Sequence, residues 1–165
     1  MDRTRKAPQI RFSTLYPAGP TGEVEAPAHA TEPIARVLVM DDDAMVRETI
    51  GTALSRLGCR TDFAADGERA LQMYGDALAA RDPYALVVMD LRVEQGPGAR
   101  ETIGGLLELD PEARAIISSG YSYDATVADY RKHGFVDVLI KPYRLARLQE
   151  VLQKHVPAFQ AKRAG

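Results

Sequence analysis

Three aspartates in a row follow a short apolar run near residue 40. Val37–Met40 reads as a buried strand, and Asp41, Asp42 and Asp43 come directly after it. Neighbouring carboxylates repel one another and lose hydration energy on burial, so a cation is expected beside Asp41 and Asp42. The pair could instead open a helix, where negative charge is favourable, and Asp43 reads as the N-cap of such a helix.

Three other apolar runs end in polar residues of related chemistry. "ALVVMD" ends at Asp90, "AIISSG" gives Ser118 and Ser119, and "VLIKPY" gives Lys141. Carboxylate oxygens suit Mg²⁺, a lysine supplies a positive charge for a phosphoryl group, and a hydroxyl can donate to a phosphoryl oxygen. With charge screened in this way, one carboxylate could act as a nucleophile and become an aspartyl phosphate. Each residue alone could be a turn residue or a solvated side chain, so the hypothesis depends on their joint position.

The elements that must position these residues alternate along the chain. Apolar runs of strand length cover 36–40, 60–65, 85–89, 114–118 and 137–140. Amphipathic stretches of helical spacing follow each run, at 46–57, 70–78, 103–107 (ended by Asp110), about 122–134 and 145–152. A βαβαβαβαβα order predicts a parallel sheet with helices on both faces. Because ligands bind at the carboxyl ends of such strands, the polar residues should meet at one edge.

The chain from about Arg36 to Val156 resembles the receiver domains of two-component response regulators. The resemblance lies in the acidic pair Asp41–Asp42, "MDL" at Asp90, "SSG" and "KP" at Lys141. It implies an α/β fold of the doubly wound, flavodoxin-like or CheY-like (βα)5 type, with a five-stranded parallel sheet in the order 2-1-3-4-5. It also implies a cis peptide bond between Lys141 and Pro142.

Residue by residue, the resemblance implies a phosphoacceptor site. Asp90 would take a phosphoryl group from a phosphohistidine, Ser119 would be the switch hydroxyl, and Lys141 would bind the phosphoryl group. Asp42 would ligate Mg²⁺ directly and Asp41 mainly through water. The implied metal set is completed by Asp90 and the backbone carbonyl of Arg92.

The resemblance is closest to receivers attached to hybrid sensor histidine kinases, through "AIISSGYSYD" and "YRKHGFVDVLIKPYR". The expected donor is a histidine kinase or histidine phosphotransfer protein, in cis or in trans. An output protein would bind the face made by the fourth helix, fifth strand and fifth helix. No enzymatic activity is expected beyond self-catalysed phosphorylation and dephosphorylation.

Two positions depart from the family pattern and leave alternatives open. Glu94 stands where many receivers have proline, and Val138 stands where many have an aromatic switch residue. These departures favour an alternative, a docking module that works without phosphorylation. A phosphatase of the haloacid dehalogenase type is a third hypothesis, but Arg92 stands where that type has its second acid.

Composition sets the remaining limits. The chain has 165 residues, 21 Lys and Arg and 23 Asp and Glu, a net charge of −2 that gives no electrostatic argument for nucleic acid or membrane surfaces. A single cysteine, Cys59, excludes an internal disulfide and a Cys-pair zinc site.

No apolar run is long enough to cross a bilayer, and we expect a cytoplasmic protein. Residues 1–34 hold five of the ten prolines and read as a disordered arm or linker, 35–157 as the receiver and 158–165 as a tail.

Overall fold

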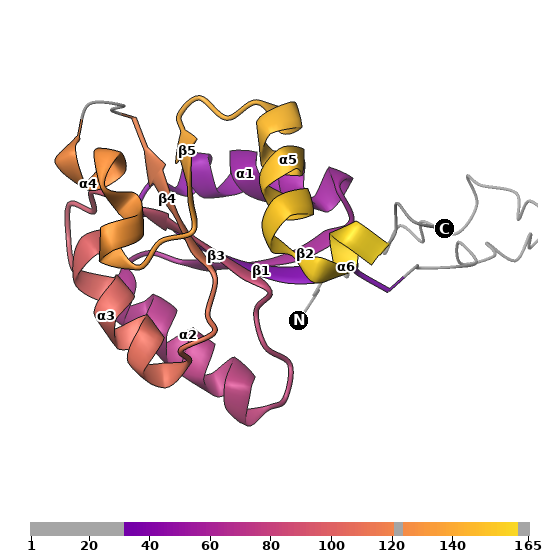
Figure 1. The fold of residues 1–165 in the computed structure, drawn as a ribbon, viewed down its shortest axis with the longest axis horizontal. Coiled ribbons are helices and arrows are strands. Elements are labelled where there is room, and N and C mark those ends of the chain that lie inside the picture. Colours follow the sequence, from indigo (N-terminus) through magenta and orange to yellow (C-terminus); the bar gives the residue numbers. More distant parts are fainter. Residues whose placement is uncertain (1–31, 121–123, 162–165) are drawn as a thin grey trace, which may run out of the picture. The chain divides into compact units, whose positions relative to one another are not determined.

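A computed structural model describes residues 32–120 and 124–161, and a five-stranded sheet lies at its centre (Figure 1). The strands are β1 (Ala35–Met40), β2 (Cys59–Ala64), β3 (Leu86–Asp90), β4 (Ala115–Ser119) and β5 (Asp137–Ile140). All neighbouring strands pair in parallel, in the order β2-β1-β3-β4-β5. The predicted fold class and strand order are confirmed.

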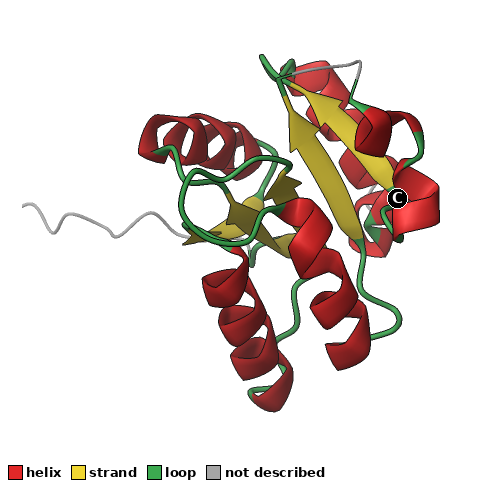
Figure 2. Cartoon of the chain, turned by 90° about the vertical axis from the view of Figure 1, so that its left-hand side faces the viewer, coloured by secondary structure: helices red, strands yellow, loops and turns green. Residues whose placement is uncertain are grey.

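Helices cover both faces of the sheet, because the crossovers are right-handed and the strand order reverses direction after β2. They are α1 (Ala44–Arg56), α2 (Gly67–Ala79), α3 (Ala99–Leu109), α4 (Ala125–Ala128), α5 (Leu145–His155) and α6 (Pro157–Ala161), with a 3₁₀ helix at Tyr130–His133. The helices α2 and α3 pack on one face, and α1 and α5 on the other. Figure 2 shows the strands between these helices.

Alternation along the strands builds two hydrophobic cores from one sheet. Leu38 and Met40 of β1 point into the core shared with α2 and α3, whereas Val37 and Val39 point into the core shared with α1 and α5. All four side chains are at most 1% exposed. A strand buried on both faces has no polar side, and this explains the continuous apolar runs in the sequence.

Side-chain caps fix where two helices begin. The carboxylate of Asp43 accepts hydrogen bonds from the backbone amides of Met45 (2.8 Å) and Val46 (3.4 Å). Asp66 caps α2 in the same way, accepting from the amide of Arg69 at 2.8 Å. The prediction that Asp43 is an N-cap is confirmed, and this separates it from the two preceding aspartates.

The predicted fourth helix, about Ser122 to Gly134, is wrong in form. The structure has one α-helical turn, α4, followed by the 3₁₀ turn, which ends at Gly134 with φ 96°. Of the hydrophobic side chains at 124–134, Val127 and Tyr130 pack, partly buried, against the core. With so little apolar contact, and with β-branched Thr126 and Val127 in it, the segment gains too little from packing to sustain a long helix. Its predicted first residues, 122 and 123, lie outside the described residues.

Packing at the carboxyl end extends beyond the predicted domain boundary at residue 157. The short helix α6 places Phe159 in the core that α1 and α5 share.

The predicted arm, residues 1–34, lies almost wholly outside the described residues. At its last residue, the Ile34 amide donates to the Gly58 carbonyl at 2.8 Å. Among the described residues, no helix combines the length and the apolar character that crossing a membrane requires.

Candidate functional site

Three carboxylates meet where β1 and β3 end. Asp41 and Asp42 follow β1, Asp90 is the last residue of β3, and one oxygen from each lies within 4.8 Å of the other two. Asp41 is 2% exposed and Asp90 is 7% exposed, whereas Asp42 lies nearer the surface. The sequence therefore located this cluster correctly, from the ends of separate apolar runs.

Lys141 connects two of these carboxylates. It follows β5, and its Nζ donates to Asp41 Oδ2 at 2.7 Å and to Asp90 Oδ1 at 2.9 Å. No motif in the sequence indicates the bond to Asp41. The Lys141–Pro142 peptide bond is cis, as the resemblance implied.

Burial and mutual repulsion set the protonation behaviour of the site. Burial raises the pKa of Asp90, and the two neighbouring carboxylates raise it further, while Lys141 opposes them. Burial alone would lower the pKa of Lys141, but its hydrogen bonds to Asp41 and Asp90 bring that pKa above its ordinary value. The lysine is therefore an ammonium at neutral pH. One such charge leaves three carboxylates only partly compensated.

Backbone amides hold the carboxylates in place. The Asp43 amide donates to Asp41 Oδ1 and the Glu94 amide donates to Asp42 Oδ2, each at 3.0 Å. A proline has no N–H and could not make the second bond, so this contact requires a residue other than proline at position 94.

The donor set fits a hard divalent cation such as Mg²⁺. The three carboxylates offer oxygen ligands only, their charge exceeds that of Lys141, and the more exposed Asp42 leaves a side for water. Arg92 lies two residues beyond Asp90, and its side chain pairs with Asp124 at 3.2 Å. Metal ligation by its backbone carbonyl stays a prediction.

The two serines of β4 face different surroundings. Ser119 is the last residue of the strand and 3% exposed, and its backbone carbonyl accepts from the Lys141 amide at 2.8 Å. Ser118 Oγ shares a hydrogen bond with the Tyr143 hydroxyl. Tyr143 had no assigned role from the sequence, where its only signal was its place in "KPY". Tyr121, two residues after Ser119, lies outside the described residues.

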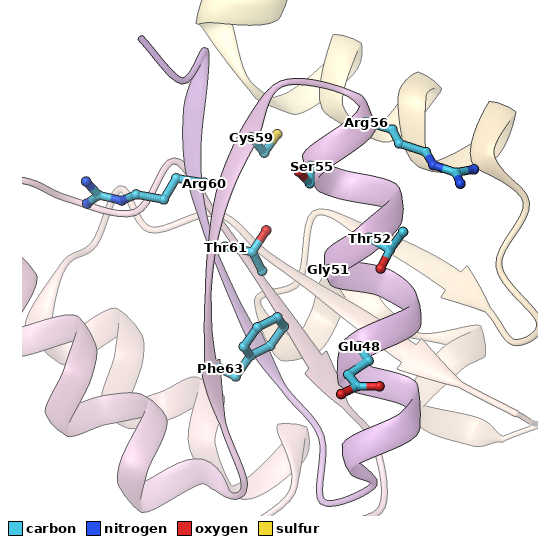
Figure 3. A pocket seen from close by; sticks show the side chains of 9 residues that line it. All are labelled: Glu48, Gly51, Thr52, Ser55, Arg56, Cys59, Arg60, Thr61 and Phe63. Atoms are coloured by element: carbon cyan, nitrogen blue, oxygen red, sulfur yellow. The ribbon is translucent and has the colours of Figure 1, made fainter. Parts of the chain in front are cut away.

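A separate groove between α1 and β2 contains none of the candidate site residues (Figure 3). Thr61 and Phe63 of β2 point toward α1, where Gly51 lets the Phe63 ring approach the helix backbone. Burial raises the pKa of Cys59 to about 11, so its thiol is protonated and poorly nucleophilic at neutral pH. Nothing in this groove resembles a reactive centre.

Comparison with known proteins decides the family. Residues 37–153 match the family model described as "Response regulator receiver domain". The chain belongs to this family of receiver domains.

Individual relatives agree with this assignment. Over 120 residues the receiver is 28% identical to the chemotaxis protein CheY of Thermotoga maritima, covering 72% of this chain and 95% of that protein. Over 106 residues it is 33% identical to the photosynthetic apparatus regulatory protein RegA of Rhodobacter capsulatus, covering 64% of this chain and 54% of RegA. The match thus spans nearly all of CheY and about half of RegA.

A solved structure shows the same fold. The CheX–CheY–BeF₃–Mg²⁺ complex from Borrelia burgdorferi superposes with a TM-score of 0.66 and 26% identity. The superposition covers 74% of this chain and 90% of that chain. That complex holds magnesium and beryllofluoride.

Proposed function

We propose that this receiver domain accepts a phosphoryl group on Asp90 from the phosphohistidine of a histidine kinase or histidine phosphotransfer protein, and that it uses Mg²⁺. The observation that carries the proposal is the cluster of Asp41, Asp42 and Asp90 within 4.8 Å, with Lys141 bonded to the first and the last. Asp41 and Asp42, with Asp90 and the Arg92 carbonyl, would hold the metal.

In the proposed transfer, a carboxylate oxygen of Asp90 forms a new P–O bond while the P–N bond to the donor imidazole breaks. The electron pair of that bond leaves with the imidazole. Mg²⁺ held by Asp41, Asp42, Asp90 and the Arg92 carbonyl would supply positive charge for the phosphoryl oxygens. Lys141 and the Ser119 hydroxyl would bind the remaining phosphoryl oxygens, and Asp41 would keep the ammonium near Asp90 when a new ligand arrives.

The burial of Asp90 supports its role as the acceptor. A carboxylate at 7% exposure is shielded from water on most sides, and Lys141 offsets part of its charge. Hydrolysis would then be slow enough for the phosphorylated form to persist and to shift a conformational equilibrium. The domain would act as a cytoplasmic switch with self-catalysed phosphorylation and dephosphorylation only. The face formed by α4, β5 and α5 would bind an output protein or a tethered kinase.

Intact-mass measurement with a small phosphodonor, with and without Mg²⁺, tests the proposal. We expect a Mg²⁺-dependent gain of one phosphoryl group that Asp90→Asn abolishes. Asp43→Asn is the matched control, because asparagine caps a helix as well as aspartate does and Asp43 is outside the predicted ligand set. Labelling that persists at another residue in Asp90→Asn would show the acceptor to be wrong.

The second candidate, a docking module independent of phosphorylation, is favoured by Val138. This aliphatic side chain packs partly buried against the core on the α2–α3 face and offers no hydroxyl to a rotating switch. Metal binding without labelling, and partner affinity unchanged by beryllofluoride, would favour this candidate over the first.

A further inference from the structure

Tyr143 lies two residues after Lys141, where β5 leads into α5. Its ring packs against the core shared by α1 and α5, and its hydroxyl reaches back across the sheet edge to Ser118 Oγ. Ser118 is only 1% exposed. Burial raises the pKa of Tyr143, so its phenol keeps its proton at neutral pH and can donate. The Tyr143 side chain is half-buried, whereas the Ser118 hydroxyl is buried, so breaking the bond would leave the serine without this partner away from water.

A second bond holds the same loop one residue further along β4. The Lys141 amide donates to the Ser119 carbonyl at 2.8 Å. Residues 141 and 143 are thus attached to consecutive residues of one strand, on either side of Pro142. The Lys141 side chain leaves the backbone at one of these attachment points and reaches Asp41 and Asp90.

The same strand end is connected to the acceptor. Ser118 is the register partner of Asp90, and its carbonyl accepts from the Leu91 amide at 2.9 Å. The hydroxyl of Tyr143 therefore holds the loop that carries Lys141 against the strand that adjoins Asp90. Lysine has a long and flexible side chain, so the position of its ammonium depends strongly on where its backbone is fixed.

We propose that the Tyr143 hydroxyl, through its hydrogen bond to Ser118, is a positioning residue that keeps the Lys141 ammonium in place for phosphoryl transfer to Asp90. This inference rests on the proposed function. In this chain the aromatic side chain that contacts β4 is Tyr143, and it lies on the face of the sheet that α1 and α5 cover. Val138, at the position where an aromatic ring was expected, lies on the other face and cannot form such a bond.

Tyr143→Phe tests the inference, because it keeps the ring and removes only the hydroxyl. At saturating Mg²⁺ and phosphodonor we expect the labelling rate of Asp90 to fall about three- to tenfold, the factor that corresponds to one ordinary hydrogen bond. The Mg²⁺ dissociation constant should change less than about twofold, since the three carboxylates stay in place. Ser118→Ala should give the same fall, and the double variant should be no slower than either single variant.

Tyr74→Phe is the matched control, because it removes a phenol bonded to Asp110 Oδ2 at 2.8 Å between α2 and α3. Its labelling rate should equal that of the wild type. The NMR signal of the Lys141 side chain, followed in ¹³C-lysine-labelled protein at one fixed pH, provides a readout independent of labelling. We expect it to shift and broaden in Tyr143→Phe and Ser118→Ala only.

The outcomes separate the two proposals. If the wild type is not labelled at all, the proposed function fails, and the Lys141 signal alone then decides the positioning role. A Tyr143→Phe variant with an unchanged Lys141 signal, or with wild-type labelling, would overturn the inference. An equal rate loss in Tyr143→Phe and Tyr74→Phe would also overturn it, because the effect would then be general destabilisation.

Discussion

Replacing Asp90 by asparagine should stabilise the metal-free protein, although Asp90 is the predicted phosphoacceptor. Asparagine has nearly the same shape, and its oxygen can still accept from Lys141. The substitution removes one of three carboxylates that have oxygens within 4.8 Å of one another. Most replacements of buried polar residues destabilise a protein, so a gain here would be specific evidence for electrostatic strain in the site.

The magnitude follows from the geometry. At an effective dielectric constant of about 20, a carboxylate oxygen no more than 4.8 Å away repels Asp90 by at least roughly 3.5 kcal/mol, and two such neighbours are present. The attraction to Lys141 at 2.9 Å is roughly 6 kcal/mol on the same scale, which leaves a small net repulsion. Burial of the charge adds a desolvation cost. We expect Asp90→Asn to raise the free energy of unfolding by about 1–2 kcal/mol, or roughly 3–6 °C in Tm.

The pH dependence provides a sign test. Because the pKa of Asp90 is raised in the folded state, its protonated form favours folding, and that contribution is lost as pH rises through the folded-state value. The gain in unfolding free energy of Asp90→Asn over the wild type should therefore be absent at low pH and should grow as pH rises above about 4. Urea unfolding with EDTA at several pH values measures it, with exposed Asp129→Asn as the control. A metal-free Asp90→Asn that is less stable than the wild type at pH 7 would refute the electrostatic account, as would an advantage that does not depend on pH.

Three further predictions concern the same charges. Asp137 is buried and bonded to Arg147, Lys154 and His155, and its pKa is lowered to about 2. Asp137→Asn should therefore lower the free energy of unfolding by about 2 kcal/mol at pH 7. In urea unfolding this loss should disappear as the pH falls from about 4 to about 2. Asp42→Ala should weaken Mg²⁺ binding in calorimetry at least tenfold with little loss of stability, whereas Asp43→Ala should lower stability by about 1 kcal/mol and leave Mg²⁺ affinity unchanged. Lys141→Met should tighten Mg²⁺ binding by about tenfold, because a competing cation is removed, and should slow labelling of Asp90.

The sequence predicted the sheet better than it predicted the fourth helix, for a physical reason. Strands buried on both faces must be apolar throughout, so their runs are unmistakable, and each observed strand begins and ends within one residue of its predicted run. The segment around Val127 has two apolar residues on one side, a pattern that a helix or successive short turns can satisfy equally well. Propensity alone could not decide between them, since α4 is a single turn held by an Asp124 cap.

The same contrast holds within the site. Asp41, Asp90 and Lys141 were predictable as neighbours because parallel strands end at one edge. The bond between Tyr143 and Ser118 was not, because it depends on how one ring packs across 25 residues of chain. The Glu94 amide contact with Asp42 was hidden for another reason: backbone donors leave no trace in side-chain chemistry, except where proline would remove them.

Three identical residues in a row have different roles here because they connect the end of β1 to the start of α1, and each has a different backbone environment. Asp41 still has the orientation of a strand residue and is buried against Lys141, whereas Asp43 has turned to cap α1. Asp42 lies between them, more exposed, and is held by an amide from another loop. The arrangement gathers more negative charge than one lysine can neutralise, so we expect the metal-free site to lower the stability of the fold. The same excess charge makes binding of a divalent cation favourable, so the strain that Asp90→Asn should relieve is the source of the metal affinity that the proposed phosphorylation requires.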